Sequence, residues 1–99
     1  NTLTDNYYGI VSATNENAKL QLSIASNNIT NNLQDGVAIT TSLPLVNPAP
    51  GTSQTNISLQ NNTVTGNNTT GAGFDDVSVA NFRNGSNMCV QAKNNTFSS

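Results

Sequence analysis

Residues 25–32 read Ala-Ser-Asn-Asn-Ile-Thr-Asn-Asn, and three other stretches repeat this pattern in register: Asn1–Asn6, Asn61–Asn67 and Asn94–Ser99. In each stretch an asparagine stands two residues before an apolar side chain. Aligning the asparagines Asn1, Asn27, Asn62 and Asn95 therefore gives one apolar column, which consists of Leu3, Ile29, Val64 and Phe97. Self-similarity at a period of a few tens of residues predicts a solenoid, in which each layer buries its apolar face against its neighbours.

Between these motifs lie short stretches in which apolar and polar residues alternate. Alternation with a period of two is typical of half-buried strands and argues against a disordered polar tract. The pattern predicts strands over residues 7–13, 20–24, 37–39, 57–59, 77–79 and 90–92.

The three repeats differ in length. Asn1 to Asn27 spans 26 residues, Asn27 to Asn62 spans 35, and Asn62 to Asn95 spans 33. We assign much of the excess to two loop insertions, residues 42–53 with three prolines and residues 81–87, because proline excludes a central strand. Both insertions follow the same strand of their repeat, which predicts that they emerge from the same corner. We interpret residues 1–99 as a single segment of about three layers, excerpted from a longer solenoid.

The aligned columns predict how the layers are joined. The apolar column should point inward and stack at the strand spacing of roughly 4.8 Å. Asn27, Asn62 and Asn95 should occupy turns in a left-handed backbone conformation, with their amides bonded in a ladder. Parallel strands without helical periodicity then predict an all-β, right-handed parallel β-helix solenoid of about three coils. A β-sandwich is the alternative, since it also uses regularly spaced short strands.

The pattern Asn-Asn-x-Ile-Thr-x-Asn followed by Gly-Val, at residues 27–37 and in variant form at residues 1–10, resembles a known repeat. It is similar to the parallel β-helix repeat of pectin-degrading enzymes, of the periplasmic copper-maturation protein family and of bacterial surface passengers. The resemblance covers essentially the whole chain. It implies a fold more than an activity, because these families differ in what their coils carry.

Composition excludes several classes of function. The net charge is −2 with only three Lys and Arg residues, which argues against nucleic-acid binding. His is absent and Cys89 is the single cysteine, so we expect no intrachain disulfide, metal or cofactor site. The chain contains no apolar run of about 18 residues, and we expect no membrane span in this segment.

One interpretation of the polar residues is enzymatic. Asp75 and Asp76 form the only acidic pair, with Arg83 nearby in sequence, and β-helix polysaccharide hydrolases use an acid and a base on neighbouring coils. Adjacent carboxylates also commonly flank a turn. The resemblance to the hydrolases implies Asn-Thr-Asp, His-containing and Arg-x-Lys segments, which this chain lacks. These three residues are therefore weak catalytic candidates, and catalytic coils outside the segment remain an alternative.

The interpretation that we favour is a binding module. The insertions supply apolar and cationic side chains on an otherwise polar surface, which suits a docking partner: Leu43, Leu45, Val46, Phe82 and Arg83. A protective flap over a sheet edge is the alternative for the first insertion. We expect an adhesin-like or passenger module of an exported bacterial protein, secreted, on the cell surface or periplasmic, which binds carbohydrate or protein and self-associates through uncapped ends. The second hypothesis is a non-catalytic portion of a carbohydrate-active enzyme.

Overall fold

A computed structural model describes residues 1–15, 17–41, 52–71, 75–82 and 85–98. Every regular element in these ranges is a β-strand. The strands in chain order are β1 (Thr2–Thr4), β2 (Ile10–Thr14), β3 (Lys19–Ala25), β4 (Asn28–Thr30), β5 (Val37–Thr41), β6 (Gln54–Gln60), β7 (Thr63–Thr65), β8 (Val77–Asn81), β9 (Asn87–Lys93) and β10 (Thr96–Ser98).

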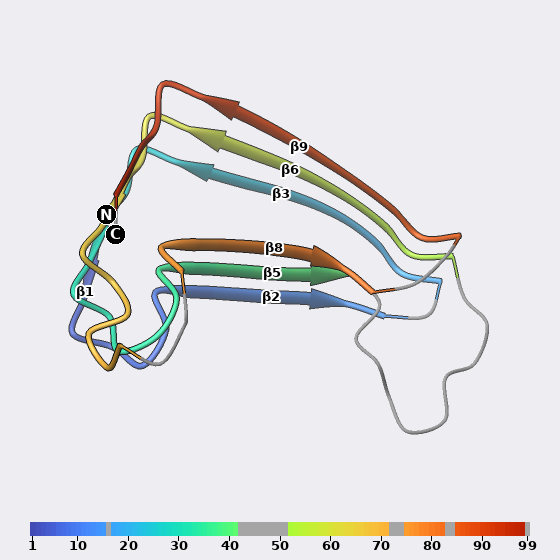
Figure 1. Ribbon diagram of the computed structural model, residues 1–99. Helices are drawn as coiled ribbons and strands as arrows, with labels where there is room; N and C mark the ends of the chain where they lie inside the picture. The colour runs from blue at the N-terminus through green and yellow to red at the C-terminus, as the bar shows by residue number, and fades with distance from the viewer. Residues whose placement is uncertain (16, 42–51, 72–74, 83–84, 99) are drawn as a thin grey trace.

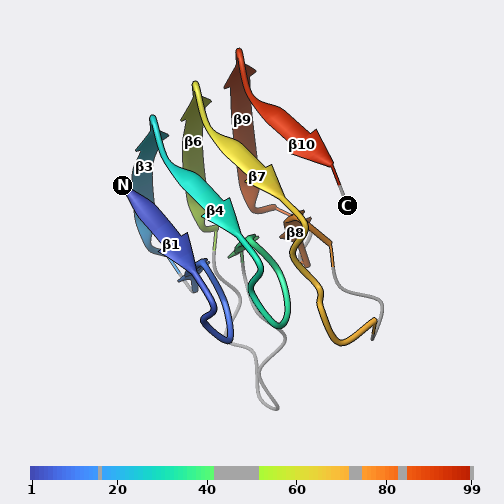
Figure 2. The same cartoon turned by 90° about the vertical axis from the view of Figure 1, so that its left-hand side faces the viewer.

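The strands form three parallel sheets, which the chain visits in a fixed order (Figures 1 and 2). We call them the short sheet (β1-β4-β7-β10), the middle sheet (β2-β5-β8) and the long sheet (β3-β6-β9). Each passage through the three sheets makes one layer, and successive layers pair strand on strand. The predictions of an all-β fold and of parallel strands are confirmed. The apolar column of the aligned repeats is also the register of the short sheet, in which Leu3 pairs with Ile29, Ile29 with Val64 and Val64 with Phe97.

The core lies between the three sheets. Its buried side chains point inward from alternate positions of the strands: Ile24, Ile29, Val37, Ile39, Ile57, Leu59 and Val64. Most of them belong to the second layer, which has a layer on each side. By contrast, Val79 of the third layer, which pairs with Ile39 of the second, is 38% exposed. Stability in this arrangement therefore comes from contacts between layers, with each fully buried aliphatic side chain contributing about 1.5 to 3 kcal/mol.

Several predicted boundaries were wrong; the strands expected over residues 57–59 and 90–92, for example, extend over Gln54–Gln60 and Asn87–Lys93. The strand expected over residues 7–13 begins only at Ile10, because Tyr7 and Gly9 belong to a turn that bonds to the next layer through Gln34 N–Tyr7 O (2.9 Å) and Gly9 N–Asp35 O (3.2 Å). The second insertion is also shorter than predicted. Asn81 ends β8 and Asn87 begins β9, which leaves residues 82–86 as the connection. Most of the first insertion, residues 42–51, lies outside the described residues.

A glycine column controls how closely the layers approach. A Cβ added at Gly36 would lie 2.5 Å from Val64 Cγ1, 2.6 Å from Asn67 Nδ2 and 2.7 Å from the Asp76 carbonyl oxygen, so only glycine fits there. Gly9 occupies the same column one layer earlier, and its added Cβ would lie 2.3 Å from the Gly36 carbonyl oxygen. In the third layer the column continues with Asp76, since Val37 pairs with Val77.

Candidate functional site

The predicted asparagine column forms a row of side-chain hydrogen bonds between layers. Asn1 Nδ2 donates to Asn27 Oδ1 at 3.2 Å, Asn27 Nδ2 to Asn62 Oδ1 at 3.1 Å, and Asn62 Nδ2 to Asn95 Oδ1 at 3.0 Å. Asn62 is buried and also donates to the Ile24 carbonyl oxygen at 2.8 Å. We call these four residues the first ladder. Their side chains bond one layer to the next, which is a structural role.

The expectation of a left-handed backbone at the first ladder was wrong by one residue. The residues with positive φ are Ser26 (56°), Asn61 (54°) and Asn94 (55°), each directly before a ladder asparagine. The reason is that the two residues of the turn have different roles. The left-handed residue reverses the chain, and the residue after it keeps an ordinary backbone and directs its amide toward the next layer.

A second ladder was missed in the sequence analysis. Asn32 Nδ2 donates to Asn67 Oδ1 at 2.8 Å, and Asn67 Nδ2 donates to Asp76 Oδ1 at 2.7 Å. All three side chains are buried. A signal was available, because Asn6, Asn32 and Asn67 each stand five residues after a member of the first ladder. The two ladders therefore flank the short sheet, one at the start and one at the end of its strands.

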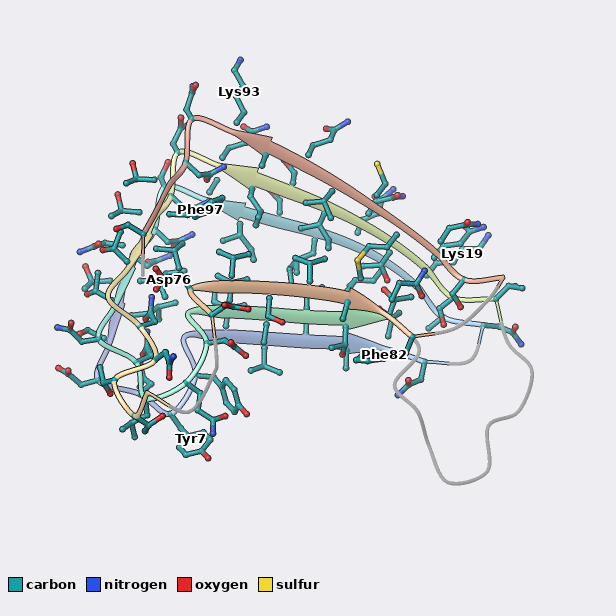
Figure 3. All side chains as sticks on the ribbon, viewed as in Figure 1. Tyr7, Lys19, Asp76, Phe82, Lys93 and Phe97 are labelled. Carbon is teal, nitrogen blue, oxygen red and sulfur yellow. The ribbon has the colours of Figure 1, made fainter. Side chains whose placement is uncertain are left out.

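The two candidate catalytic aspartates differ in burial and in hydrogen bonding. Asp76 is buried, and its Oδ1 accepts from both Asn67 N (2.9 Å) and Asn67 Nδ2 (2.7 Å). Asp75 is exposed, and its backbone N–H donates to Asp35 Oδ1 at 2.8 Å. Both border a hollow of about 300 Å³ with Val77, Phe97 and Ser98, and Figure 3 labels Asp76 and Phe97 at this end of the molecule. Arg83 lies outside the described residues, so the structure places only the two aspartates of this set. Asp76 holds a ladder position, which assigns it a structural role.

The predicted binding residues fall mostly beyond the described ranges. Leu43, Leu45, Val46 and Arg83 lie outside them. Phe82 follows β8 and is 53% exposed, and its backbone N–H donates to the Thr41 carbonyl oxygen at 3.1 Å. The strands β2, β5 and β8 all end on the side of the molecule opposite to the short sheet (Figure 1).

A larger hollow lies on the outside of the long sheet. Its volume is about 470 Å³, and its lining includes Leu22 and Ile57, two residues whose side chains pack in the core. Around them stand uncharged polar side chains from all three layers, which we call the outer face: Gln21, Ser23, Asn56, Ser58, Cys89 and Gln91. The register sets Gln21, Asn56 and Cys89 in one row and Ser23, Ser58 and Gln91 in the next. Lys19 and Lys93 stand at opposite ends of the sheet (Figure 3), and neither is among the residues that line the hollow.

Sequence reasoning missed the outer face because its residues are the polar half of the strand alternation. Alternation marks which residues point outward. It does not indicate where outward-pointing side chains border a hollow, since that depends on the curvature of the sheet.

The described residues offer few other sites. Among them no group of three or more His, Cys, Asp or Glu side chains could hold a metal ion. None of the described segments forms a helix that is long and apolar enough to cross a membrane. No known protein family, curated protein or solved structure matches the chain.

Proposed function

We propose that the chain is a stretch of right-handed parallel β-helix that serves as an adhesin-like or passenger module of an exported bacterial protein. Three features support the proposal. The chain visits three parallel sheets in a constant order, the repeats stack in register, and two side-chain ladders join the layers. A solenoid of this kind holds a rigid lateral surface while its connections vary, which suits a binding scaffold.

The ligand class that we propose is carbohydrate, and the outer face is the observation that carries this proposal. Amides and hydroxyls provide both donors and acceptors, as a sugar with many hydroxyl groups requires. The absence of charge among the residues that line the hollow suits a neutral glycan. The hollow spans all three layers, so an extended chain could bind along the direction in which the layers stack.

The corner connections are a second part of the same proposal. Phe82 is exposed at the corner after β8, and the first insertion leaves from the corresponding corner one layer earlier. Leu43, Leu45, Val46 and Arg83, which lie outside the described residues, belong to this part of the proposal by their place in the sequence alone. The alternative of a non-catalytic portion of a carbohydrate-active enzyme uses the same outer face. An enzymatic role for Asp75 and Asp76 is not part of this proposal: Asp76 Oδ1 accepts two bonds from Asn67, and Asp76 Oδ2 is buried without a hydrogen-bond partner.

Affinity electrophoresis tests the proposal. The chain is run through gels containing neutral polysaccharides of three types: mixed-linkage β-glucan, xyloglucan and galactomannan. We expect retardation by at least one of them, and loss of that retardation in the double variant Asn56→Ala, Gln91→Ala. Gln54→Ala is the matched control, since Gln54 is exposed on the same sheet and is not among the residues that line the hollow. Equal retardation of both variants would place binding elsewhere, and no retardation of the unmodified chain would remove the carbohydrate proposal.

A further inference from the structure

The turn between β1 and β2 carries a cluster of exposed apolar side chains that the fold does not require. Tyr7 is 58% exposed, Tyr8 36% and Leu33, which follows in the next layer, 42%. The backbone joins the two layers here, since Leu33 N donates to Asn6 O and Gln34 N donates to Tyr7 O, both at 2.9 Å. We call Tyr7, Tyr8, Leu33 and Gln34 the aromatic corner. Figure 3 labels Tyr7 on the outer side of this turn, away from the core.

Leu33 shows that this exposure is not an effect of lying in a terminal layer. It belongs to the second layer, between two others, where the inward-pointing Ile29 is fully buried. The corresponding turn of the first layer adds two tyrosines beside it. These three neighbouring side chains are 36% to 58% exposed and are not part of the buried core cluster, and such patches commonly mark binding sites.

The rings are held in a defined geometry. Their centroids are 5.0 Å apart and their planes meet at 73°, which is the edge-to-face arrangement favoured by aromatic pairs. Gln34 Nε2 donates to the Tyr7 hydroxyl at 2.7 Å and so fixes one ring. Gln34 Oε1, by contrast, is buried and has no hydrogen-bond partner. A buried acceptor without a donor is costly, and a ligand hydroxyl can supply the missing donor only if the Gln34 side chain turns to expose Oε1.

We propose that the aromatic corner is a separate site that binds a neutral pyranoside. A pyranose ring has C–H-rich faces bordered by hydroxyl groups, so it matches an exposed ring face next to an amide and a phenol. Lys19 and Lys93 lie in the long sheet and not at this turn, so the corner offers an anionic sugar no pairing with either. The inference does not depend on binding at the outer face.

The ring geometry favours a sugar over a proline-rich peptide. Recognition of polyproline segments uses aromatic side chains that line a groove. In an edge-to-face pair, one ring directs its edge at the other, and no slot remains between parallel faces. What remains is a platform for one ring of a ligand.

Intrinsic fluorescence isolates this site from the rest of the molecule. The chain has two tyrosines and no tryptophan, so tyrosine emission arises only at the aromatic corner. Titration with cellohexaose should change this emission saturably. Tyr8→Ala should abolish the saturable change in the remaining Tyr7 emission. Tyr7→Phe, followed through Tyr8, keeps the ring, removes the hydroxyl that Gln34 contacts and should weaken binding about two- to tenfold, as expected for one hydrogen bond.

Two controls separate this site from the others. Phe82→Ala removes an exposed ring at a different corner and should leave the titration unchanged, as should the outer-face double variant Asn56→Ala, Gln91→Ala. Circular dichroism of each variant checks that the fold is retained. The proposal is overturned if cellohexaose gives no saturable change, if Tyr8→Ala binds like the unmodified chain, or if a polyproline decapeptide saturates the signal and the sugar does not.

Discussion

The connections at the two ends of each layer differ in how much their length varies. The turns that enter the short sheet always have two residues, 26–27, 61–62 and 94–95. The connections at the opposite end, between the middle and long sheets, are residues 15–18, 42–53 and 82–86, which is four, twelve and five residues. We call the first set the ladder turns and the second set the open corner. One solenoid thus combines a connection of constant length with one that varies threefold.

The difference follows from which groups join the layers at each end. At a ladder turn, the amide of Asn62 bonds to Asn27, to Asn95 and to the Ile24 carbonyl oxygen. An inserted residue would move that amide away from all three partners. At the open corner the bonds between side chains lie inside the strands, where the Thr55 hydroxyl contacts Thr14 and Thr41. The connections also bond across layers, through Thr52 N–Asn17 Oδ1 and Ser53 N–Ser86 Oγ (both 3.2 Å), but these bonds involve only a few of their residues, so the lengths of the connections can differ.

The largest expected effect on stability is at Gly36, in the glycine column beside the second ladder. Gly36→Ala places a methyl group 2.5 Å from Val64 Cγ1 and 2.7 Å from the Asp76 carbonyl oxygen, and backbone atoms cannot move aside cheaply. We expect a loss of about 3 kcal/mol in the free energy of unfolding, at the upper end for overpacking. Urea denaturation followed by circular dichroism measures it.

Gly85→Ala is the control at the open corner. Gly85 has a φ of 88°, and the nearest atom to its added Cβ is Thr52 Cγ2 at 3.8 Å. Only backbone strain of about 1 to 2 kcal/mol should result. If Gly36→Ala and Gly85→Ala lost equal free energy of unfolding, the layers would not be packed more closely at Gly36 than at the open corner.

The next effect concerns the first ladder. Asn62→Leu keeps a side chain of similar size and removes bonds to three partners, so we expect a loss of about 1 to 3 kcal/mol. Asn56→Leu, at an exposed position of β6, should change stability by less than about 0.5 kcal/mol. The ladder would lose its energetic importance if the two substitutions gave equal denaturation midpoints.

A smaller loss is expected inside the open corner. Thr55→Val preserves shape and removes a hydroxyl bonded to Thr14 at 2.7 Å and to Thr41 at 2.8 Å. Thr14 and Thr41 are paired residues of adjacent strands and can bond to each other instead, so the loss should be about 1 kcal/mol. Thr63→Val, at an exposed position of β7, is the matched control. Thermal melting of both variants measures the difference in stability. If Thr55→Val lost more stability than Asn62→Leu, the open corner and not the ladder turn would contribute more to holding the layers together.

The sequence predicted the apolar column and the first ladder of the short sheet, and it missed the second ladder although three of its asparagine positions also repeat. The Asn-x-apolar motif gave the column of the short sheet, because identical neighbours impose identical spacing. The second ladder was missed because its last member is Asp76 and not an asparagine. The position of the left-handed residue was displaced by one because asparagine occurs at both places in two of the three turns. The outer face and the aromatic corner depend on sheet curvature and ring orientation, which no spacing in a sequence specifies.

The smallest expected effect on stability is at the longest connection of the open corner. Deleting Pro44–Pro50 removes seven of the residues 42–53 and leaves five, the length that residues 82–86 already use one layer later. Shortening a loop from twelve to five residues lowers the entropy cost of closing it by about 0.8 kcal/mol. If Leu45 and Val46 serve a docking surface, the deletion should therefore leave the melting temperature unchanged or slightly raised and remove ligand capture in the affinity gel. If they form a protective flap, the melting temperature should fall instead, because the sheet edge loses its cover. A deletion that alters neither property would mean that this connection is ordinary length variation, and that binding is confined to the outer face and the aromatic corner.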